Sequence, residues 1–150
     1  MKIGLDFHGV IDKKPSYFST FTKYLLKRAC LDWHRDHPER SHEIHIITGH
    51  EDTQEFRKRL SSMGIQWTHL FSVISYHKNI GTRIEYDEKG GPWIDEGLWN
   101  KAKAHYCQRK GIDLLIDDSE VYGKYFVDIP TAYIHISTFE LLKEIIEMRI

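Results

Sequence analysis

The chain has 150 residues, 41% of them hydrophobic and 13% aromatic, and its 21 basic and 22 acidic side chains give a formal charge of −1. This balance excludes the basic excess of a dedicated nucleic-acid-binding protein, and the length fits one domain, residues 1–150, with a sizeable core. Two cysteines are too few for a disulfide framework, no apolar run reaches the roughly 20 residues that span a membrane, and no signal peptide is visible, so we expect a cytoplasmic protein without a membrane partner.

The first part of the chain predicts two strands that each lead into a helix. An apolar run, Ile3-Gly4-Leu5, ends on Asp6, and short runs of this kind are typical of buried strands in a parallel sheet. Further on, apolar positions recur at helical spacing, and Gly64 is a signal for the end of a helix. In chain order we predict a strand over 2–6, a loop over 12–16, a helix over 17–34, a strand over 43–47 and a helix over 52–63.

The second part alternates in the same way, apart from residues 77–95. There a short extended stretch over 82–86, a turn over 87–92 and a returning Trp93-Ile94 predict a small β-hairpin that projects from the sheet. Asp95 is then the expected N-cap of the next helix. In chain order we predict a strand over 70–76, the hairpin over 77–95, a helix over 96–110, strands over 112–116 and 131–136, and a helix over 138–149. The inward-facing positions of these two helices are expected at Leu98, Trp99, Ala102 and Tyr106, and at Leu141, Leu142, Ile145 and Ile146.

Strands that alternate with helices predict an α/β fold, a three-layer α/β/α, Rossmann-like domain. Its sheet would have five strands, mainly parallel, with helices on both faces. In such sheets ligands bind beyond the carboxyl ends of the strands. Three strand ends carry polar residues that are suited to chemistry, and these are Asp6, Thr48-Gly49 and Asp117-Asp118.

These strand ends have both a functional and a structural interpretation. Two carboxylates such as Asp6 and Asp117 repel each other unless they share a cation, and Mg²⁺ suits such an oxygen-rich site. An Asp at a strand end can also be a covalent nucleophile, and Gly9 would let the chain turn closely past a ligand. Structurally, Asp6 would only cap a turn, and Thr48 would form a helix capping box with Glu51.

A second metal hypothesis concerns the end of the first helix. Cys30, His34 and His37 lie at i, i+4 and i+7, a spacing that places them on one helix face and could hold zinc. Pro38 places His37 at the end of that helix, which favours a solvated helix terminus over a zinc site.

Together, the strand ends resemble the motifs of the haloacid dehalogenase (HAD) superfamily of phosphotransferases. The first motif of that family, DxDG(T/V) after a strand, is similar to Asp6-Phe7-His8-Gly9-Val10. Its second motif, a Thr or Ser that ends a strand, is similar to Thr48, and its fourth, an acidic pair, to Asp117-Asp118. The resemblance covers most of the chain in the right order. One departure stands out, because the second Asp of the family's first motif is His8 here.

The resemblance implies a Mg²⁺-dependent phosphatase. In the family pattern the first Asp, here Asp6, attacks phosphorus and forms an aspartyl-phosphate. Asp6, the backbone carbonyl of His8 and Asp117 would bind the metal, and Asp118 would support it. Thr48 and the adjacent Gly49 would bind the phosphate of the substrate.

The family's third motif is a lysine that neutralises the phosphate and the nucleophile. We assign it to Lys101, because this residue lies closer to the start of the helix over 96–110, where the phosphate would sit. Lys103 is the alternative, since helical geometry turns only one of the two inward. His8 would be the acid and base of the reaction, because the pKa of an imidazole, about 6.5, lies near working pH.

The resemblance also narrows the substrate. Neither the segment after the first motif nor residues 77–95 is long enough for a folded cap domain, so the chain looks like a capless member. Capless members tend to act on large substrates or to rely on an oligomeric neighbour, so a homo-oligomer is one expectation. The Ile-Asp-Asp sequence at 116–118 favours a nucleotide or polynucleotide phosphate. The competing hypothesis is a binding or regulatory protein on the same scaffold, with little turnover because of His8.

Overall fold

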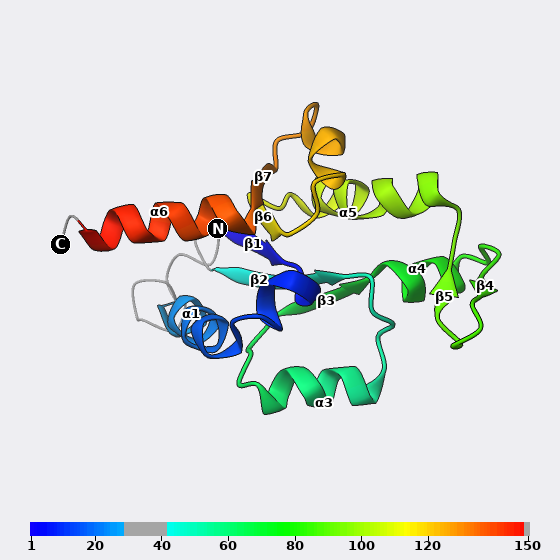
Figure 1. Cartoon of the computed structure of the whole chain (residues 1–150), viewed down its shortest axis with the longest axis horizontal. Coiled ribbons are helices and arrows are strands. Elements are labelled where there is room, and N and C mark those ends of the chain that lie inside the picture. Colours follow the sequence, from blue (N-terminus) through cyan, green and yellow to red (C-terminus); the bar gives the residue numbers. More distant parts are fainter. Residues whose placement is uncertain (29–41, 149–150) are drawn as a thin grey trace.

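Five short strands form one fully parallel sheet in the computed structural model, which describes residues 1–28 and 42–148 (Figure 1). They lie in the order β3-β2-β1-β6-β7, and each neighbouring pair is parallel. The predicted α/β fold with a five-stranded sheet is therefore confirmed. The strands are β1 (Lys2–Leu5), β2 (Glu43–Thr48), β3 (His69–Ser72), β6 (Leu114–Asp117) and β7 (Ala132–His135).

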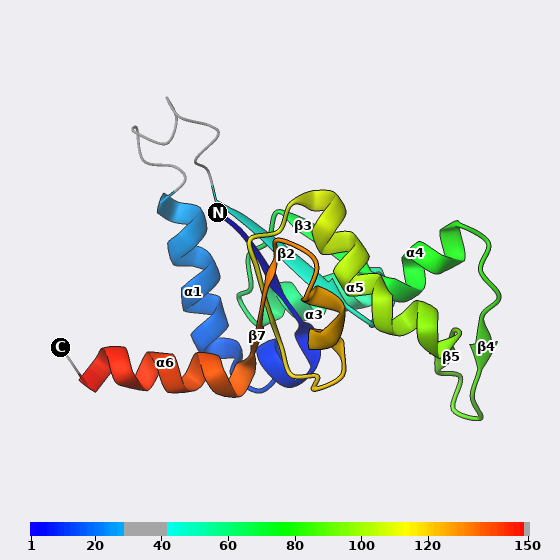
Figure 2. The same ribbon diagram turned by 90° about the horizontal axis from the view of Figure 1, so that it is seen from above.

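Helices cover both faces of this sheet, which gives the predicted three layers (Figures 1 and 2). One face packs against α1 and α3 through the first core cluster, and the other packs against α4 and α5 through the second. The helices are α1 (Pro15–Arg28), α3 (Gln54–Ser62), α4 (Val73–Asn79), α5 (Glu96–Lys110) and α6 (Ile136–Met148).

Side chains along β2 alternate between the two faces of the sheet, so this strand contributes to both core clusters. Ile44 and Ile46 pack into the α1 and α3 side, whereas Ile47 packs into the α5 side. Gly4 of β1 permits this packing, because a Cβ atom there would lie 2.7 Å from the Cδ1 atom of Ile47. The buried sheet thus holds the ends of its strands in fixed relative positions.

The predicted strand over 70–76 was wrong at its second half. β3 ends at Ser72, and the chain then turns directly into α4. The Ser72 hydroxyl accepts a hydrogen bond from the Ser75 backbone N–H at 3.0 Å and so caps the new helix. The short apolar stretch did not distinguish strand from helix, whereas this capping serine marks the boundary.

Two other predicted details were also wrong. The helix expected over 52–63 begins at Gln54, because Thr53 and not Thr48 is its cap, with 3.1 Å between the Thr53 Oγ1 and Phe56 N atoms. The expected inward positions Leu141 and Leu142 are exposed, because α6 extends beyond the sheet (Figures 1 and 2).

The predicted hairpin is confirmed as two short antiparallel strands, β4 (Glu85–Tyr86) and β5 (Pro92–Trp93). It lies at the far end of α4 and α5 (Figure 2). No folded cap domain is found in the two described ranges. None of their helices is long and apolar enough to cross a membrane. The Cys30, His34 and His37 trio lies outside the described residues.

Candidate active site

The order of the strands places two of the predicted acids side by side. From β1 the chain adds β2 and then β3 on one side, and it later adds β6 and β7 on the other side of β1. The order in which strands are added therefore reverses between β1 and β6. Such switch points are where open α/β sheets bind ligands. Leu5 is aligned with Ile116, so Asp6 and Asp117 follow at adjacent strand ends. Both carboxylates are buried.

A single lysine bridges these two carboxylates. The Nζ atom of Lys103 lies 2.6 Å from Asp117 Oδ2 and 3.0 Å from Asp6 Oδ1. Lys103 comes from α5 and is only 4% exposed. Burial alone would lower the pKa of its ammonium group, but Asp6 and Asp117 together raise it above its ordinary value. Lys103 is therefore a permanent positive charge at the strand ends.

The assignment of the motif lysine to Lys101 is therefore corrected, because Lys101 is exposed on the outer side of α5. Distance from the helix start was the wrong criterion. The buried face of α5 carries Ala102 and Tyr106. Lys103 lies beside Ala102 on this face and three residues before Tyr106, whereas Lys101 points away.

Asp6 is held in an electrostatically unfavourable position. The pKa of its carboxyl is raised from 3.8 to about 6, because burial and the nearby Asp117 carboxylate raise it by more than Lys103 lowers it. The Oδ1 atom accepts a hydrogen bond from the Phe7 backbone N–H at 2.8 Å. Asp6 also lines the cavity described below, so this buried carboxylate is accessible to a ligand.

Asp118 completes an acidic cluster. One carboxylate oxygen from each of Asp6, Asp117 and Asp118 lies within 4.8 Å of the others. Gly9 makes room for Asp118, since a Cβ atom on Gly9 would lie 1.8 Å from Asp118 Oδ2, and its φ of +78° suits glycine. His135 donates a hydrogen bond from Nε2 to the Asp118 backbone carbonyl at 2.9 Å, because its Nδ1 accepts from the Ser137 N–H.

This cluster is chemically suited to a hard divalent cation. Its three donors are all carboxylate oxygens, and their three negative charges exceed the one positive charge of Lys103 by two. Asp117 is held in place on both sides, because its Oδ1 accepts from the Ser119 backbone N–H at 2.9 Å. A cation bound to these residues would complete the charge balance.

A cavity of about 560 Å³ opens above the acids. Thr48 and Gly49, at the end of β2, both line it. The Thr48 hydroxyl is buried and accepts a hydrogen bond from the His50 backbone N–H at 3.1 Å, so it shapes this turn and is not a helix cap. The other lining residues that matter below are His50, Phe56, Trp99, Lys103 and Tyr122.

His8 reaches the cavity from the rim. Its side chain is 80% exposed, and its Nδ1 atom lies 2.9 Å from Asp12 Oδ2. The other oxygen of Asp12 accepts a hydrogen bond from the Gly9 backbone N–H at 2.7 Å, which fixes the carboxylate. When Nδ1 donates to Asp12, the Nε2 atom remains available for proton transfer. The sequence did not reveal this contact of Asp12, because the backbone at His8 and Gly9 is not helical and the turn that joins the two side chains has no simple spacing rule.

Comparisons with known proteins support the fold alone. The sequence matches no protein-family model and no curated protein. A solved structure that resembles it is that of an uncharacterized protein from Corynebacterium glutamicum, with 13% sequence identity and a TM-score of 0.50. The matched region covers 97% of this chain and 92% of that one.

Proposed function

We propose that this protein is a Mg²⁺-dependent phosphatase that hydrolyses phosphomonoesters through an aspartyl-phosphate on Asp6. The single observation that carries the proposal is the buried Asp6–Lys103–Asp117 bridge at the switch point of the sheet, open to a cavity. The order of the strand-end motifs, which resembles the HAD superfamily, is consistent with it. Of the four motif assignments made from the sequence, only the third is revised, from Lys101 to Lys103.

The proposed reaction has two steps. The Asp6 carboxylate attacks phosphorus, and the bond from phosphorus to the leaving oxygen breaks. Water then attacks the phosphorus of the aspartyl-phosphate, which releases inorganic phosphate and regenerates the carboxylate. Lys103 and the Thr48 turn would bind the negatively charged phosphoryl oxygens. Asp6, Asp117, Asp118 and the His8 carbonyl would hold Mg²⁺, which when bound supplies positive charge next to the phosphate.

His8 moves the protons in this proposal. In the first step the Nε2–H group of protonated His8 gives its proton to the leaving oxygen, and in the second step neutral Nε2 takes a proton from the attacking water. Asp12 is a positioning residue, because its contact with Nδ1 sets the tautomer that leaves Nε2 free. In this proposal His8 therefore takes over the proton transfers of the second Asp in the family pattern.

We expect His8→Ala to lose roughly 10²–10⁴-fold in turnover, the usual range for a positioned acid or base. Asp12→Asn should lose less, because the imidazole keeps its place. His8→Asp should retain activity with a different pH profile. The measurement is kcat as a function of pH for all three variants. Wild-type turnover and an unchanged profile in His8→Ala would assign proton transfer to another group.

The proposed activity is tested by phosphate release from p-nitrophenyl phosphate. We expect release in the presence of Mg²⁺, loss of release when EDTA removes the metal, and no release by Asp6→Asn. A suitable matched control is Asp113→Asn, since Asp113 lies at the opposite end of β6 and accepts a hydrogen bond from the Lys2 backbone N–H. Equal rates for the wild type and Asp6→Asn would contradict the proposal and favour a binding or regulatory protein.

A further inference from the structure

Trp99 forms a fixed wall of the cavity beside the phosphate-binding residues. It lies four residues before Lys103 on α5, so the two side chains share one face of the helix about 5–6 Å apart at their Cβ atoms. Its Nε1–H group donates a hydrogen bond to the Tyr122 hydroxyl at 2.6 Å. The six-membered ring of its indole lies against Gly49, since a Cβ atom on Gly49 would be 2.7 Å from Trp99 Cζ2. The indole is thus held at both ends.

A second pair of rings lines the same cavity. His50 and Phe56 are stacked, with 5.1 Å between their ring centroids and 7° between their planes. Both belong to the segment from the end of β2 into α3, whereas Trp99 comes from α5. Cations and hydrogen-bond donors suffice to bind a phosphate, so this much aromatic surface suits a different part of the ligand. Flat rings favour a planar, unsaturated group with a face that can stack.

Resting on the phosphatase proposed above, we propose that the substrate is a nucleoside monophosphate and that Trp99 is the residue that binds its base by stacking. The phosphate would lie at Asp6 and Lys103, and the base would stack against the indole, with the sugar between them. A cavity of about 560 Å³ is within the size range of pockets for ligands of this kind. The fixed indole would lose little freedom when the base binds.

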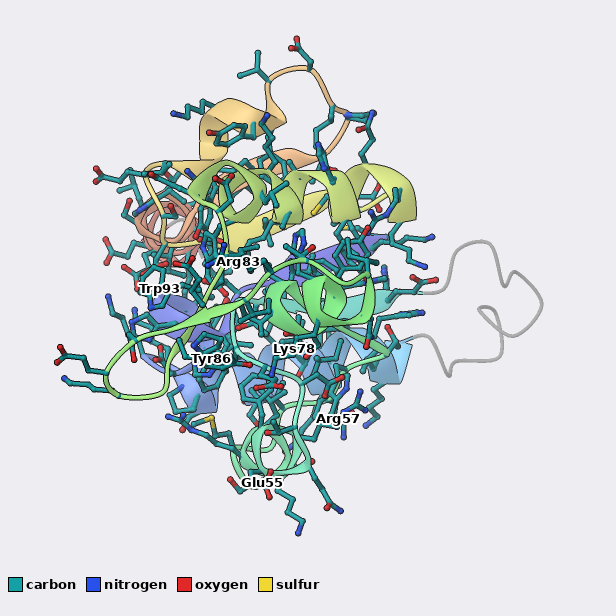
Figure 3. The ribbon with its side chains drawn as sticks, turned by 90° about the vertical axis from the view of Figure 1, so that its right-hand side faces the viewer. Glu55, Arg57, Lys78, Arg83, Tyr86 and Trp93 are labelled. Atoms are coloured by element: carbon teal, nitrogen blue, oxygen red, sulfur yellow. The ribbon has the colours of Figure 1, made fainter. Side chains whose placement is uncertain are left out.

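Three basic side chains on the surface shown in Figure 3 favour a single nucleotide over a polynucleotide. A nucleic-acid strand needs cations along a groove that are available to successive phosphates. On the face shown in Figure 3, Arg57 lies 2.7 Å from Asp52, Lys78 lies 2.5 Å from Glu51, and Arg83 lies 3.4 Å from Glu85. Each of these three cations is already paired with a carboxylate.

The test compares adenosine 5′-monophosphate with ribose 5-phosphate, which lacks only the base. We expect the wild type to favour the nucleotide by roughly 5- to 150-fold in kcat/KM, the range that one base–aromatic stack supplies. Trp99→Leu should reduce this preference to near one, while Trp99→Phe, which keeps a flat ring, should retain most of it. The matched control is Trp93→Ala, because Trp93 is 58% exposed on the hairpin, outside the cavity, with its ring 6.3 Å from that of Trp99.

A binding measurement separates this inference from the proposed activity. Titration calorimetry of both ligands into Asp6→Asn protein, with Mg²⁺ present, should show the same preference and the same loss with Trp99→Leu, without any turnover. An unchanged preference in folded Trp99→Leu, or a loss as large in Trp93→Ala, would overturn the role of Trp99. A 5′-phosphorylated oligonucleotide hydrolysed with a higher kcat/KM than the mononucleotide would overturn the choice of a free nucleotide.

Discussion

Replacing Lys103 by methionine should both destabilise the protein and strongly reduce its rate of phosphate release. The methionine fills a similar volume but leaves the buried Asp6 and Asp117 carboxylates without the cation between them. Breaking a buried ion pair from one side costs about 3–5 kcal/mol in the free energy of unfolding. Loss of the charge that binds the phosphate should lower kcat by a further 10²–10³-fold, the approximate cost of one preorganised group.

Lys101→Met is the matched control, on the same helix and two residues away. Its side chain is exposed, so we expect unfolding and turnover close to those of the wild type. Urea unfolding and phosphate release, measured for both variants, make the comparison. A larger loss of turnover in Lys101→Met than in Lys103→Met would reinstate Lys101 as the phosphate-binding lysine.

Asp6→Asn should stabilise the metal-free protein at neutral pH while it removes activity. The pKa of Asp6 is raised from 3.8 to about 6, chiefly by burial, so the folded state binds the proton more tightly than the unfolded state. The free energy of unfolding therefore falls as pH rises from about 4 to 6, and the loss is complete above that range. At about 1.36 kcal/mol per pKa unit, this displacement corresponds to about 3 kcal/mol.

Asparagine is neutral at every pH and avoids this loss. We expect Asp6→Asn and the wild type to have similar stability near pH 3.5 and the variant to be more stable at pH 7, by up to about 3 kcal/mol. Urea unfolding in EDTA at both pH values measures the difference. A variant that is less stable than the wild type at pH 7 would show that the Asp6 charge contributes favourably to the fold. Together with lost turnover, a gain in stability marks Asp6 as a functional and not a structural carboxylate.

The positions of the strand-end acids could be predicted because they depend on where apolar runs begin and end, which can be seen in the sequence. An apolar run fixes where a buried strand ends, and parallel strands bring their carboxyl ends to one edge. Asp6, Thr48 and Asp117 follow from these rules, and all three lie at the strand ends as predicted. The order of the strands, which places β6 beside β1, is a tertiary property that a strand list does not contain.

The lysine was mispredicted although the sequence contained the deciding signal. Of the four positions expected on the inner side of α5, Ala102 and Tyr106 are buried and Trp99 is half-buried, whereas Leu98 is exposed. Lys103 lies on the same stripe as Trp99 and Tyr106 by helical spacing. Lys101 was preferred because it lies closer to the start of the helix, and Lys103 was kept as the alternative. Lysine is rarely buried without a partner. Its partners, Asp6 and Asp117, are distant in sequence, so only the tertiary structure identifies them.

Acid quenching of the enzyme during turnover detects the proposed covalent bond between Asp6 and phosphorus. Substrate with an isotopically labelled phosphate is mixed with protein and Mg²⁺, the reaction is stopped in acid, and the digested peptides are examined by mass spectrometry. We predict label on the peptide that contains Asp6, released by hydroxylamine as expected for an acyl phosphate, and absent in Asp6→Asn. Steady phosphate release by the wild type with no label on any peptide would contradict the account.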